Sequence, residues 1–341
     1  MTEPVNWKGR LVGGRYRLDA LLGSGGMGTV FAAHDGKTGG KVALKLMLRE
    51  FAKDKELLLR FAAEAQLLRE FDHPNIVRVL DAGTSAEGEP FIVLEYLTGE
   101  PLNVRLERSG ALTFEQAYRF GGELASALDY AHERGVVHRD LKPGNVFLRK
   151  HSDGRESACL IDFGIAKLQD AAAKLTQSGE VFGSLLYMSP EQLVDTSSVG
   201  SASDRYSLGV LIYEMLIGDP PFFGTSVMEL HQKLVSSKPT HLSSLRADVP
   251  AWFADRVAAA LSKRPAARPH FARDLFDRNS LVPDPSRDVS SGSARGLALE
   301  GAFPAPGGGA GTIPRWVWVA VGVLGFLAVV AGLWALAQSG R

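Results

Sequence analysis

The run Val136-Val137-His138-Arg139-Asp140-Leu141-Lys142-Pro143-Gly144-Asn145-Val146-Phe147 decides the fold. One apolar run enters it and another leaves it, and between them an imidazole, two cations, a carboxylate and an amide fall within eight residues. Ionisable groups concentrated on a loop between two apolar anchors indicate chemistry rather than packing. The alternative is an ordinary charged surface loop, and the rest of the chain decides between the two.

Composition narrows the class of protein. The chain has 341 residues, a formal net charge of zero and one cysteine, Cys159. This length suits a two-lobed domain with further segments, and the balanced charge gives no electrostatic case for nucleic acid as a partner. A single cysteine excludes an internal disulfide framework and fits a reducing compartment. Because Cys159 stands in an apolar strand pattern, we predict that it fills space in the core.

A glycine-rich turn near the N-terminus indicates phosphate binding. The pattern over Arg15 to Ala33 predicts strand, turn and strand, and Gly23, Gly25 and Gly28 have the GxGxxG spacing. Glycine lets backbone amides approach a phosphate closely. The same spacing occurs in Rossmann folds, where it would open a helix. Here Thr29 to Ala33 continues as a strand, which favours a loop between two strands.

Two later segments carry a lysine and a glutamate that could serve a phosphate-binding site. Lys41 to Leu46 alternates as a strand and carries Lys45 in a Val-Ala-x-Lys pattern. Lys55 to Phe71 has a helical period, and its apolar stripe consists of Leu57, Leu58, Phe61, Ala65 and Leu68. Glu64 lies at the edge of that stripe, so its side chain can turn inward.

These motifs, followed by Asp162-Phe163-Gly164 and Pro190-Glu191, have the order and spacing of protein kinases. Over roughly residues 14–280 the chain resembles the eukaryotic-like Ser/Thr protein kinases, and its ending resembles their bacterial membrane-anchored members. The resemblance implies an α+β, bilobal protein kinase fold with a small β-rich N-lobe and a larger helical C-lobe. Lys142-Pro143-Gly144-Asn145 resembles the sequence of Ser/Thr rather than Tyr kinases.

The resemblance implies a site for ATP and Mg²⁺, with Mn²⁺ as an alternative. Asp140 would accept or orient the proton of the substrate hydroxyl, and Lys142 would stabilise the transferring phosphate. Lys45 would bind the α- and β-phosphates and be held by Glu64. Oxygen ligands for the metal would come from Asn145 and Asp162. The nucleotide would contact Leu22, Gly23, Ser24, Gly25, Gly26, Met27, Gly28, Thr29, Val30, Ala43, Lys45, Glu95, Leu97 and Phe147.

Further roles follow from the same resemblance. Leu94 would be the gatekeeper of the adenine site, with the backbone of Glu95 and Leu97 next to it. An internal stack would consist of Leu68, Val79, His138 and Phe163, so we predict that His138 packs rather than transfers protons. The position of Asp204 near the start of the buried helix 204–216 predicts an N-terminal cap, and the resemblance implies that it also anchors the backbone of the catalytic loop. Arg268 would pair with Glu191. Amphipathic helices are predicted near 227–236, 250–262 and 272–278.

The segment between Asp162 and Pro190 resembles an activation segment. Thr176 and Ser178 are the predicted autophosphorylation sites, and Arg139 could bind a phosphate placed there. Ser184 stands where kinases usually carry a threonine bonded to the catalytic aspartate and lysine, so it is predicted to support catalysis rather than act as a switch. Ser189 departs from the usual Ala-Pro-Glu ending.

The ends of the chain differ from its middle. We predict an N-terminal tail at 1–13, the kinase domain at 14–281, a Pro/Gly/Ser/Ala-rich linker at 282–314, a transmembrane helix at 315–337 and a short extracytoplasmic tail at 338–341. Trp316 to Ala337 contains no charge and is long enough to span a bilayer. The expected location is the cell membrane, with one span and a cytoplasmic kinase domain. Expected partners are protein substrates, the membrane and a second copy for trans-autophosphorylation.

Two other functions compete with an active protein kinase. A pseudokinase scaffold would usually lack the strand lysine, the catalytic aspartate or the metal aspartate, yet Lys45, Asp140 and Asp162 are all present. A small-molecule kinase of related fold is disfavoured by the intact segment ending at Pro190-Glu191, which shapes a peptide-binding surface in protein kinases.

Overall fold

We describe a computed structural model of the chain. The structure describes residues 7–25, 28–47, 55–163, 183–194, 199–224 and 226–280. All of these residues lie in one compact unit of the chain, Met1–Arg287. Several predictions fall outside the described residues: those for Gly26 and Met27, for Thr176 and Ser178, and for the linker and the transmembrane helix. Among the described residues, no helix is long and apolar enough to cross a membrane.

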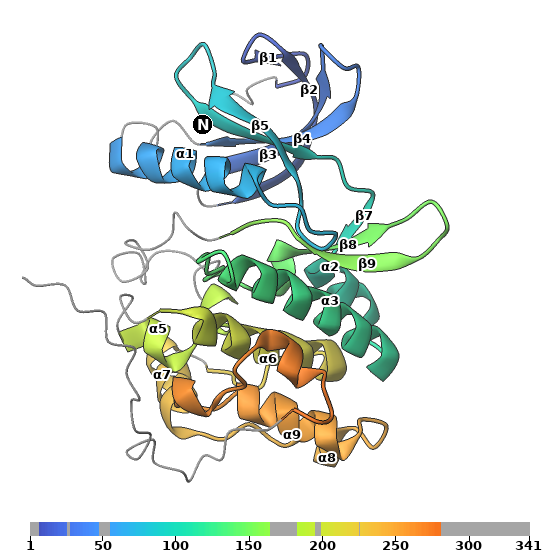
Figure 1. The fold of residues 1–341 in the computed structure, drawn as a ribbon, viewed down its shortest axis with the longest axis vertical. Helices are drawn as coiled ribbons and strands as arrows, with labels where there is room; N and C mark the ends of the chain where they lie inside the picture. The colour runs from blue at the N-terminus through green and yellow to red at the C-terminus, as the bar shows by residue number, and fades with distance from the viewer. Residues whose placement is uncertain are drawn as a thin grey trace, which may run out of the picture. The chain divides into compact units, whose positions relative to one another are not determined.

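The N-terminal lobe is a twisted antiparallel sheet with one helix against it (Figure 1). Its strand order is β1-β2-β3-β4-β6-β5. The bounds are β1 (Leu11–Val12), β2 (Tyr16–Gly25), β3 (Gly28–Asp35), β4 (Lys41–Met47), β5 (Val79–Thr84) and β6 (Pro90–Glu95). The alternation of β4 buries Val42, Leu44 and Leu46 in the sheet's own core. It therefore leaves Ala43 and Lys45 on the opposite face.

Residues 7–13, from the segment predicted as a tail, take part in this lobe. Strand β1 pairs with β2, with Leu11 opposite Arg17. The ring of Trp7 packs against that of Phe31 at a centroid distance of 5.2 Å. Arg10 forms ion pairs with Glu87 and Glu89, on the turn between β5 and β6. These contacts join distant parts of the chain, so the local pattern of the segment gives no sign of them.

Helix α1 (Lys55–Arg69) confirms the predicted helix, although it ends two residues earlier than Phe71. From the predicted stripe, Phe61, Ala65 and Leu68 are buried in the larger core cluster. After the helix, Asn75 donates a side-chain hydrogen bond to the carbonyl oxygen of Ala158 (2.8 Å). Apolar residues begin at Ile76, but Ile76 bridges to Leu160, and strand β5 begins only at Val79.

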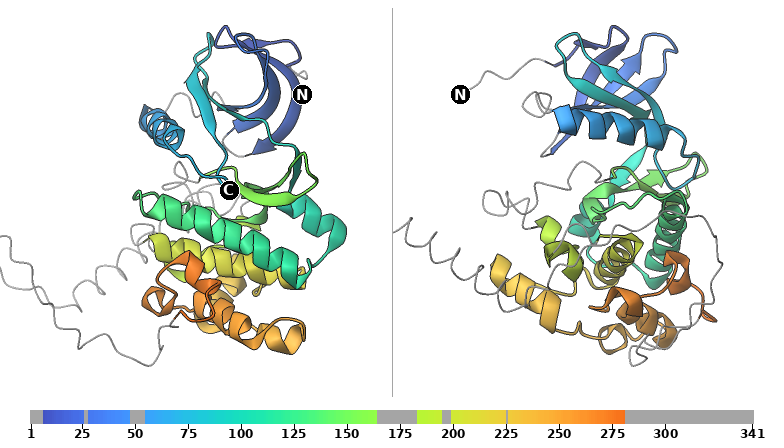
Figure 2. Two further views of the ribbon diagram at one scale, coloured as in Figure 1. Left: turned by 45° about the vertical axis from the view of Figure 1, so that its right-hand side comes forward. Right: turned by 60° about the vertical axis from the view of Figure 1, so that its left-hand side comes forward.

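A small three-stranded sheet lies between the upper sheet and the helices (Figures 1 and 2). Its strands are β7 (Gly99–Pro101), β8 (Val146–Lys150) and β9 (Glu156–Leu160), in the order β7-β8-β9. Strands β8 and β9 form an antiparallel hairpin around residues 151–154, with Phe147 opposite Cys159. This sheet places the catalytic loop, which precedes β8, next to Asp162, which follows β9.

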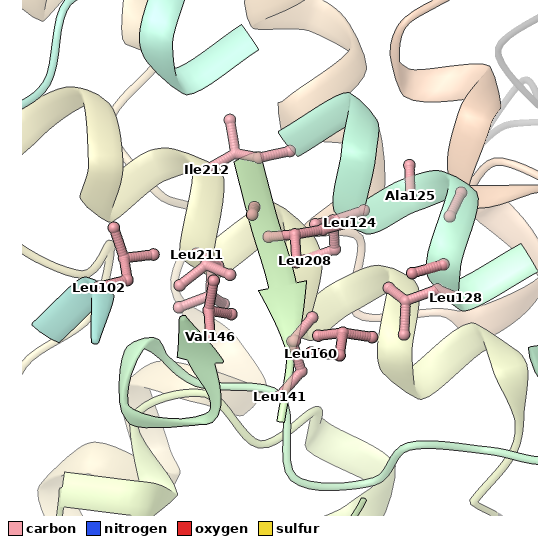
Figure 3. Packing of buried hydrophobic residues seen from close by; sticks show 14 of the residues in the cluster. Leu102, Leu124, Ala125, Leu128, Leu141, Val146, Leu160, Leu208, Leu211 and Ile212 are labelled. Atoms are coloured by element: carbon pink, nitrogen blue, oxygen red, sulfur yellow. The ribbon is translucent and has the colours of Figure 1, made fainter. Parts of the chain in front are cut away.

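The C-terminal lobe is built from helices. They are α2 (Leu102–Ser109), α3 (Phe114–His132), α5 (Pro190–Val194), α6 (Ser201–Ile217), α7 (Val227–Ser236), α8 (Leu242–Leu245) and α9 (Ala251–Ala260), with 3₁₀ turns η2 (Pro143–Asn145), η5 (Pro265–Ala267) and η6 (Ala272–Leu275). Helix α6 is buried on almost every side, as predicted. Figure 3 shows its residues Leu208, Leu211 and Ile212 among side chains of α3, β8 and β9.

Two predictions about this lobe are wrong. Asp204 is not the cap of α6, because the helix begins at Ser201 with Gly200 as its N-cap. The small residues 201–203 extend the helix by a turn, and the apolar pattern does not reveal this turn. The helix predicted at 272–278 is only the 3₁₀ turn η6. Its first amides, from Ala272 and Arg273, bind the buried carboxylate of Asp129 instead of a longer helix.

Candidate active site

The catalytic loop brings three predicted residues together. The Asn145 side-chain nitrogen donates to the backbone oxygen of Asp140 (2.6 Å) and to its Oδ2 (2.8 Å). The Lys142 Nζ lies 3.3 Å from Asp140 Oδ2 and donates to the Ser184 hydroxyl oxygen (2.9 Å). The expected contact of Ser184 with the catalytic lysine is therefore confirmed. Asp140 and Asn145 are both 8% exposed, so the network fixes their side chains.

A buried carboxylate below the loop holds its backbone. Asp204 is 1% exposed, and its two oxygens accept the amides of His138 (2.7 Å) and Arg139 (2.8 Å). His132 Nε2 lies 2.7 Å from Asp204 Oδ2. Burial alone would raise the pKa of Asp204, but the hydrogen bond with His132 and the loop amides lowers it. The predicted anchoring of the loop is confirmed, with His132 as a partner that the sequence analysis did not identify.

Lys45 and Asp162 meet although they lie far apart in the sequence. Lys45 Nζ donates to both oxygens of the Asp162 carboxylate, at 2.7 and 2.8 Å. This contact places the predicted phosphate-binding cation beside the predicted metal ligand. Glu64 lies on α1, but its side chain is outside the described residues, so its pairing with Lys45 stays a prediction.

The glycine loop is the tip of the hairpin formed by β2 and β3. The register places Gly23 opposite Val30, Ser24 opposite Thr29 and Gly25 opposite Gly28. This arrangement confirms strand, turn and strand and excludes the helix of a Rossmann fold. A Cβ at Gly28 would lie 2.6 Å from the backbone oxygen of Leu46, so only glycine fits there. The hairpin leads from this tip to Val30, which lies opposite Lys45 on β4.

The predicted adenine residues come from three strands. Ala43 lies opposite Leu94, the predicted gatekeeper, across β4 and β6. Phe147 lies on β8 opposite Pro101. Ala43, Leu94 and Phe147 are each half-buried, as expected for side chains that would line a ligand face, and Leu97 follows β6. Their contacts with a nucleotide stay a prediction.

The side chain of Glu95, beside the predicted adenine site, is held by two donors that no sequence motif indicates. Glu95 Oε1 accepts from the guanidinium of Arg149 on β8 (2.6 Å) and from the amide of Arg78 (3.0 Å). Glu95, at the end of β6, is therefore bonded both to the segment that leads into β5 and to strand β8. The available signal was an arginine directly after three apolar strand residues, and such a residue is usually only solvent-exposed.

One contact of the predicted internal stack, between His138 and Phe163, is confirmed. Phe163 is 3% exposed and belongs to the same core cluster as Leu68 and Val79. The ring of His138 lies 4.7 Å from that of Phe163, centroid to centroid, and His138 is fully buried. Its Nδ1 accepts the Asp140 amide at 3.3 Å. His138 therefore packs and braces the loop, as predicted.

Glu191 and Arg268 form a bidentate ion pair, which confirms their predicted pairing. The distances are 2.6 Å from Arg268 Nη1 to Glu191 Oε1 and 2.8 Å from Nη2 to Oε2. The Arg268 side chain is fully buried and also donates to the carbonyl oxygens of Ser262 and Ala202. Burial would raise the pKa of Glu191, but the hydrogen bonds from Arg268 lower it to about 2. The pair fixes the end of the segment that precedes α5.

Cys159 is fully buried opposite Phe147. Burial raises the pKa of its thiol to about 12, so the thiol stays protonated and unreactive. Its predicted role as core filler is confirmed.

Comparisons with known proteins agree with this geometry. Residues 16–278 match the family model of the protein kinase domain. The chain is 37% identical over 301 residues to the serine/threonine-protein kinase PknA of Mycobacterium tuberculosis, covering 85% of this chain and 68% of PknA. It is 37% identical over 304 residues to the probable serine/threonine-protein kinase PknB of Bifidobacterium longum, covering 84% of this chain but only 43% of that protein.

The solved structures give the same result. The crystal structure of the PknI kinase domain of Mycobacterium tuberculosis aligns with a TM-score of 0.62 at 28% identity, covering 80% of this chain and 97% of that domain. The match includes both lobes, and the relatives in sequence are kinases of serine and threonine. The chain therefore belongs to the protein kinase family, as a bacterial eukaryotic-like serine/threonine protein kinase.

Proposed function

We propose that this chain transfers the γ-phosphate of Mg²⁺-bound ATP to Ser and Thr hydroxyls of proteins, including its own activation segment, at a membrane. One observation carries the proposal: Asp140, Lys142 and Asn145 converge on one point beside Ser184. An acid–base carboxylate, a cation and an amide oxygen in that arrangement suit an incoming hydroxyl and a transferring phosphate.

The residues present fit a magnesium ion. Because the Asn145 side-chain nitrogen is directed at Asp140, its amide oxygen is the atom available as a ligand, together with the carboxylate of Asp162. Among the described residues, no group of three or more His, Cys, Asp or Glu side chains is arranged to hold a metal ion by itself. Mg²⁺ does not require one, since it commonly binds one or two protein ligands plus substrate phosphates. When bound, the ion would neutralise charge on the triphosphate.

The chain's own groups would then divide the work of the reaction. The substrate hydroxyl oxygen forms a bond to the γ-phosphorus while the bond to the β–γ bridging oxygen breaks and ADP leaves. Asp140 orients the hydroxyl and takes its proton, and Lys142 stabilises the charge on the transferring group. Lys45, next to Asp162, would bind the α- and β-phosphates.

A transfer assay separates this function from a pseudokinase scaffold. Labelled ATP with a generic basic protein is expected to give Mg²⁺-dependent label on Ser and Thr, and chelation of the metal should stop it. The intact Lys45, Asp140 and Asp162 support the active enzyme. If folded protein transfers no label with Mg²⁺ or Mn²⁺, the scaffold is the better proposal. Label on a small metabolite alone would favour the small-molecule kinase.

Autophosphorylation is expected at Thr176 and Ser178. Arg139 precedes Asp140, and its guanidinium can bind a phosphate on the activation segment. Mass spectrometry of the purified protein incubated with ATP and Mg²⁺ should find phosphate on one or both residues, and none on Ser184, whose hydroxyl is bonded to Lys142. An Asp140→Asn protein treated identically is the control. Active protein without phosphate at either Thr176 or Ser178 would contradict this regulation.

The full-length protein is expected in the membrane fraction. Residues 316–337 contain no charge and, as a helix, would span about 33 Å, close to a hydrocarbon core of roughly 30 Å. Trp316, Trp318 and Trp334 lie near the two ends, where interfacial tryptophans are common. Because ATP is cytosolic, the kinase domain would face the cytoplasm. Small residues at four-residue spacing, such as Ala328 and Gly332, could let two such helices pair.

Membrane fractionation tests whether residues 316–337 anchor the protein in the membrane. A chain ending at Pro283 is expected to be soluble, while full-length protein should resist extraction by carbonate and high salt and dissolve only in detergent. Release of full-length protein by carbonate would refute the membrane span.

A further inference from the structure

One hydrogen bond joins the start of α5 to the catalytic loop. Gln192 Oε1 accepts from the Ser189 amide (2.9 Å) and hydroxyl (3.0 Å), as in a capping box at a helix N-terminus. The Gln192 side-chain nitrogen donates in another direction, to the backbone oxygen of Arg139 (3.0 Å). The two ends of this amide therefore serve two different segments of the chain.

Arg139 is the residue for which this bond matters. Its φ is 67°, and among the described residues it is the only non-glycine residue with a positive φ. A non-glycine residue adopts such a backbone only under strain and keeps it where its surroundings hold it. Asp204 binds the Arg139 amide at 2.8 Å, and Gln192 binds its carbonyl oxygen. That carbonyl belongs to the peptide that leads into Asp140, so its orientation sets the direction of the catalytic side chain.

The backbone next to Gln192 is held in place by the buried ion pair of Glu191 and Arg268. Glu191, the neighbour of Gln192, is clamped by the buried Arg268 and accepts a third hydrogen bond from the Ser203 hydroxyl (2.8 Å). A hydrogen bond from a fixed donor restrains its acceptor more than one from a mobile surface residue. Gln192 can therefore transmit the position of the segment ending at Pro190-Glu191 to the catalytic loop.

We infer that Gln192 is a positioning residue for Asp140, acting through the Arg139–Asp140 peptide. The inference rests on the proposed phosphoryl transfer. Glutamine is the side chain that this role requires, because the amide and hydroxyl of Ser189 need an acceptor and the Arg139 carbonyl oxygen needs a donor. Glutamate at 192 would keep the acceptor but point a carboxylate at a carbonyl oxygen, and methionine would supply neither group.

The chain contains its own matched control. At the start of α3, the Gln116 side chain makes the same two hydrogen bonds as that of Gln192: its Oε1 accepts from the Thr113 amide (3.2 Å) and hydroxyl (3.3 Å). This box lies on the surface. Gln116→Glu therefore makes the same chemical change in the same helix position without touching the Arg139 carbonyl.

The experiment compares full-length wild-type protein with Gln192→Glu, Gln192→Met and Gln116→Glu. Turnover on a basic protein substrate with Mg²⁺-ATP gives kcat and the KM for ATP, and thermal unfolding gives Tm. Both Gln192 variants are expected to lower kcat about three- to tenfold, the range for loss of one hydrogen bond. Their KM for ATP should stay within about twofold, since no nucleotide contact changes. Gln116→Glu should match wild type.

Each result decides the inference. Wild-type kcat in Gln192→Glu would overturn it, because the capping box alone would then explain the residue. A parallel loss of kcat, ATP affinity and Tm in both Gln192 variants would mark damage to the fold and would also overturn it. An inactive wild type would reject the proposed function and this inference with it. An active wild type with an unaffected Gln192→Glu would reject only the inference.

Discussion

Asp162→Asn and Lys45→Met are each expected to remove nearly all phosphoryl transfer while the fold survives. The first change weakens a metal ligand, and the second removes the cation that would position the phosphates. The two side chains touch at 2.7 Å, so each change also leaves the other charge without this partner. Retention of a tenth of the activity would correspond to a loss of only about 1.4 kcal/mol in transition-state stabilisation, which is too little for such a group.

The measurement is Mg²⁺-dependent transfer to a basic protein, with circular dichroism to verify folding. Asp153→Asn is a matched control, because Asp153 lies on the exposed turn of the β8–β9 hairpin. It should retain full activity. A well-folded Asp162→Asn or Lys45→Met protein that keeps more than about a tenth of wild-type turnover would show that the role assigned to that residue is wrong.

Arg268→Met is expected to lower the free energy of unfolding more than any other substitution proposed for this protein. It leaves Glu191 half-buried without its cation, and breaking a buried ion pair from one side costs about 3–5 kcal/mol. The carbonyl oxygens of Ser262 and Ala202 lose their donor as well. The change is to be measured as the free energy of unfolding in urea. Arg264→Met, an exposed residue in the same loop, should change it by less than about 0.5 kcal/mol.

A double variant separates the cost of an unpaired charge from the loss of packing. Arg268→Met combined with Glu191→Leu removes both charges, and an apolar replacement of a buried pair is often neutral. Most of the stability lost in Arg268→Met should therefore return. If Arg268→Met unfolds at the same urea concentration as wild type, the ion pair does not contribute to stability.

The same pair predicts a dependence on pH. The pKa of Glu191 is about 2 in the folded protein and near 4.5 for an ordinary glutamate. Because the folded pKa is lowered, the unfolded state binds more protons between these values. The stability contributed by Glu191 is thus fully present above about pH 4.5 and is lost as the pH falls toward 2. Arg268→Met should lose this part of the acid sensitivity.

Much of the fold follows from local pattern in the sequence. The alternation of Lys41 to Leu46 predicts a strand with Lys45 opposite the buried face, and β4 has that arrangement. The helical stripe ending at Leu68 and the apolar run that became α6 also follow from periodicity alone. Periodicity predicts these elements because the direction of each side chain repeats with the period of the helix or strand, so the residues of one buried face recur at fixed spacing in the sequence. The sequence also identified Asp140, Lys142 and Asn145 as candidate site residues, and the structure brings them together.

Tertiary structure alone decided which of these groups meet. Lys45 binds Asp162, Arg149 holds Glu95, and Gln192 holds Arg139, across separations of 117, 54 and 53 residues. No local pattern encodes such pairs, because a hydrogen bond depends on the three-dimensional position of two atoms rather than on their spacing in sequence. The start of α6 at Ser201 could not be predicted for a related reason. The local sequence makes Asp204 resemble an N-cap, but its carboxylate accepts hydrogen bonds from the amides of a distant loop.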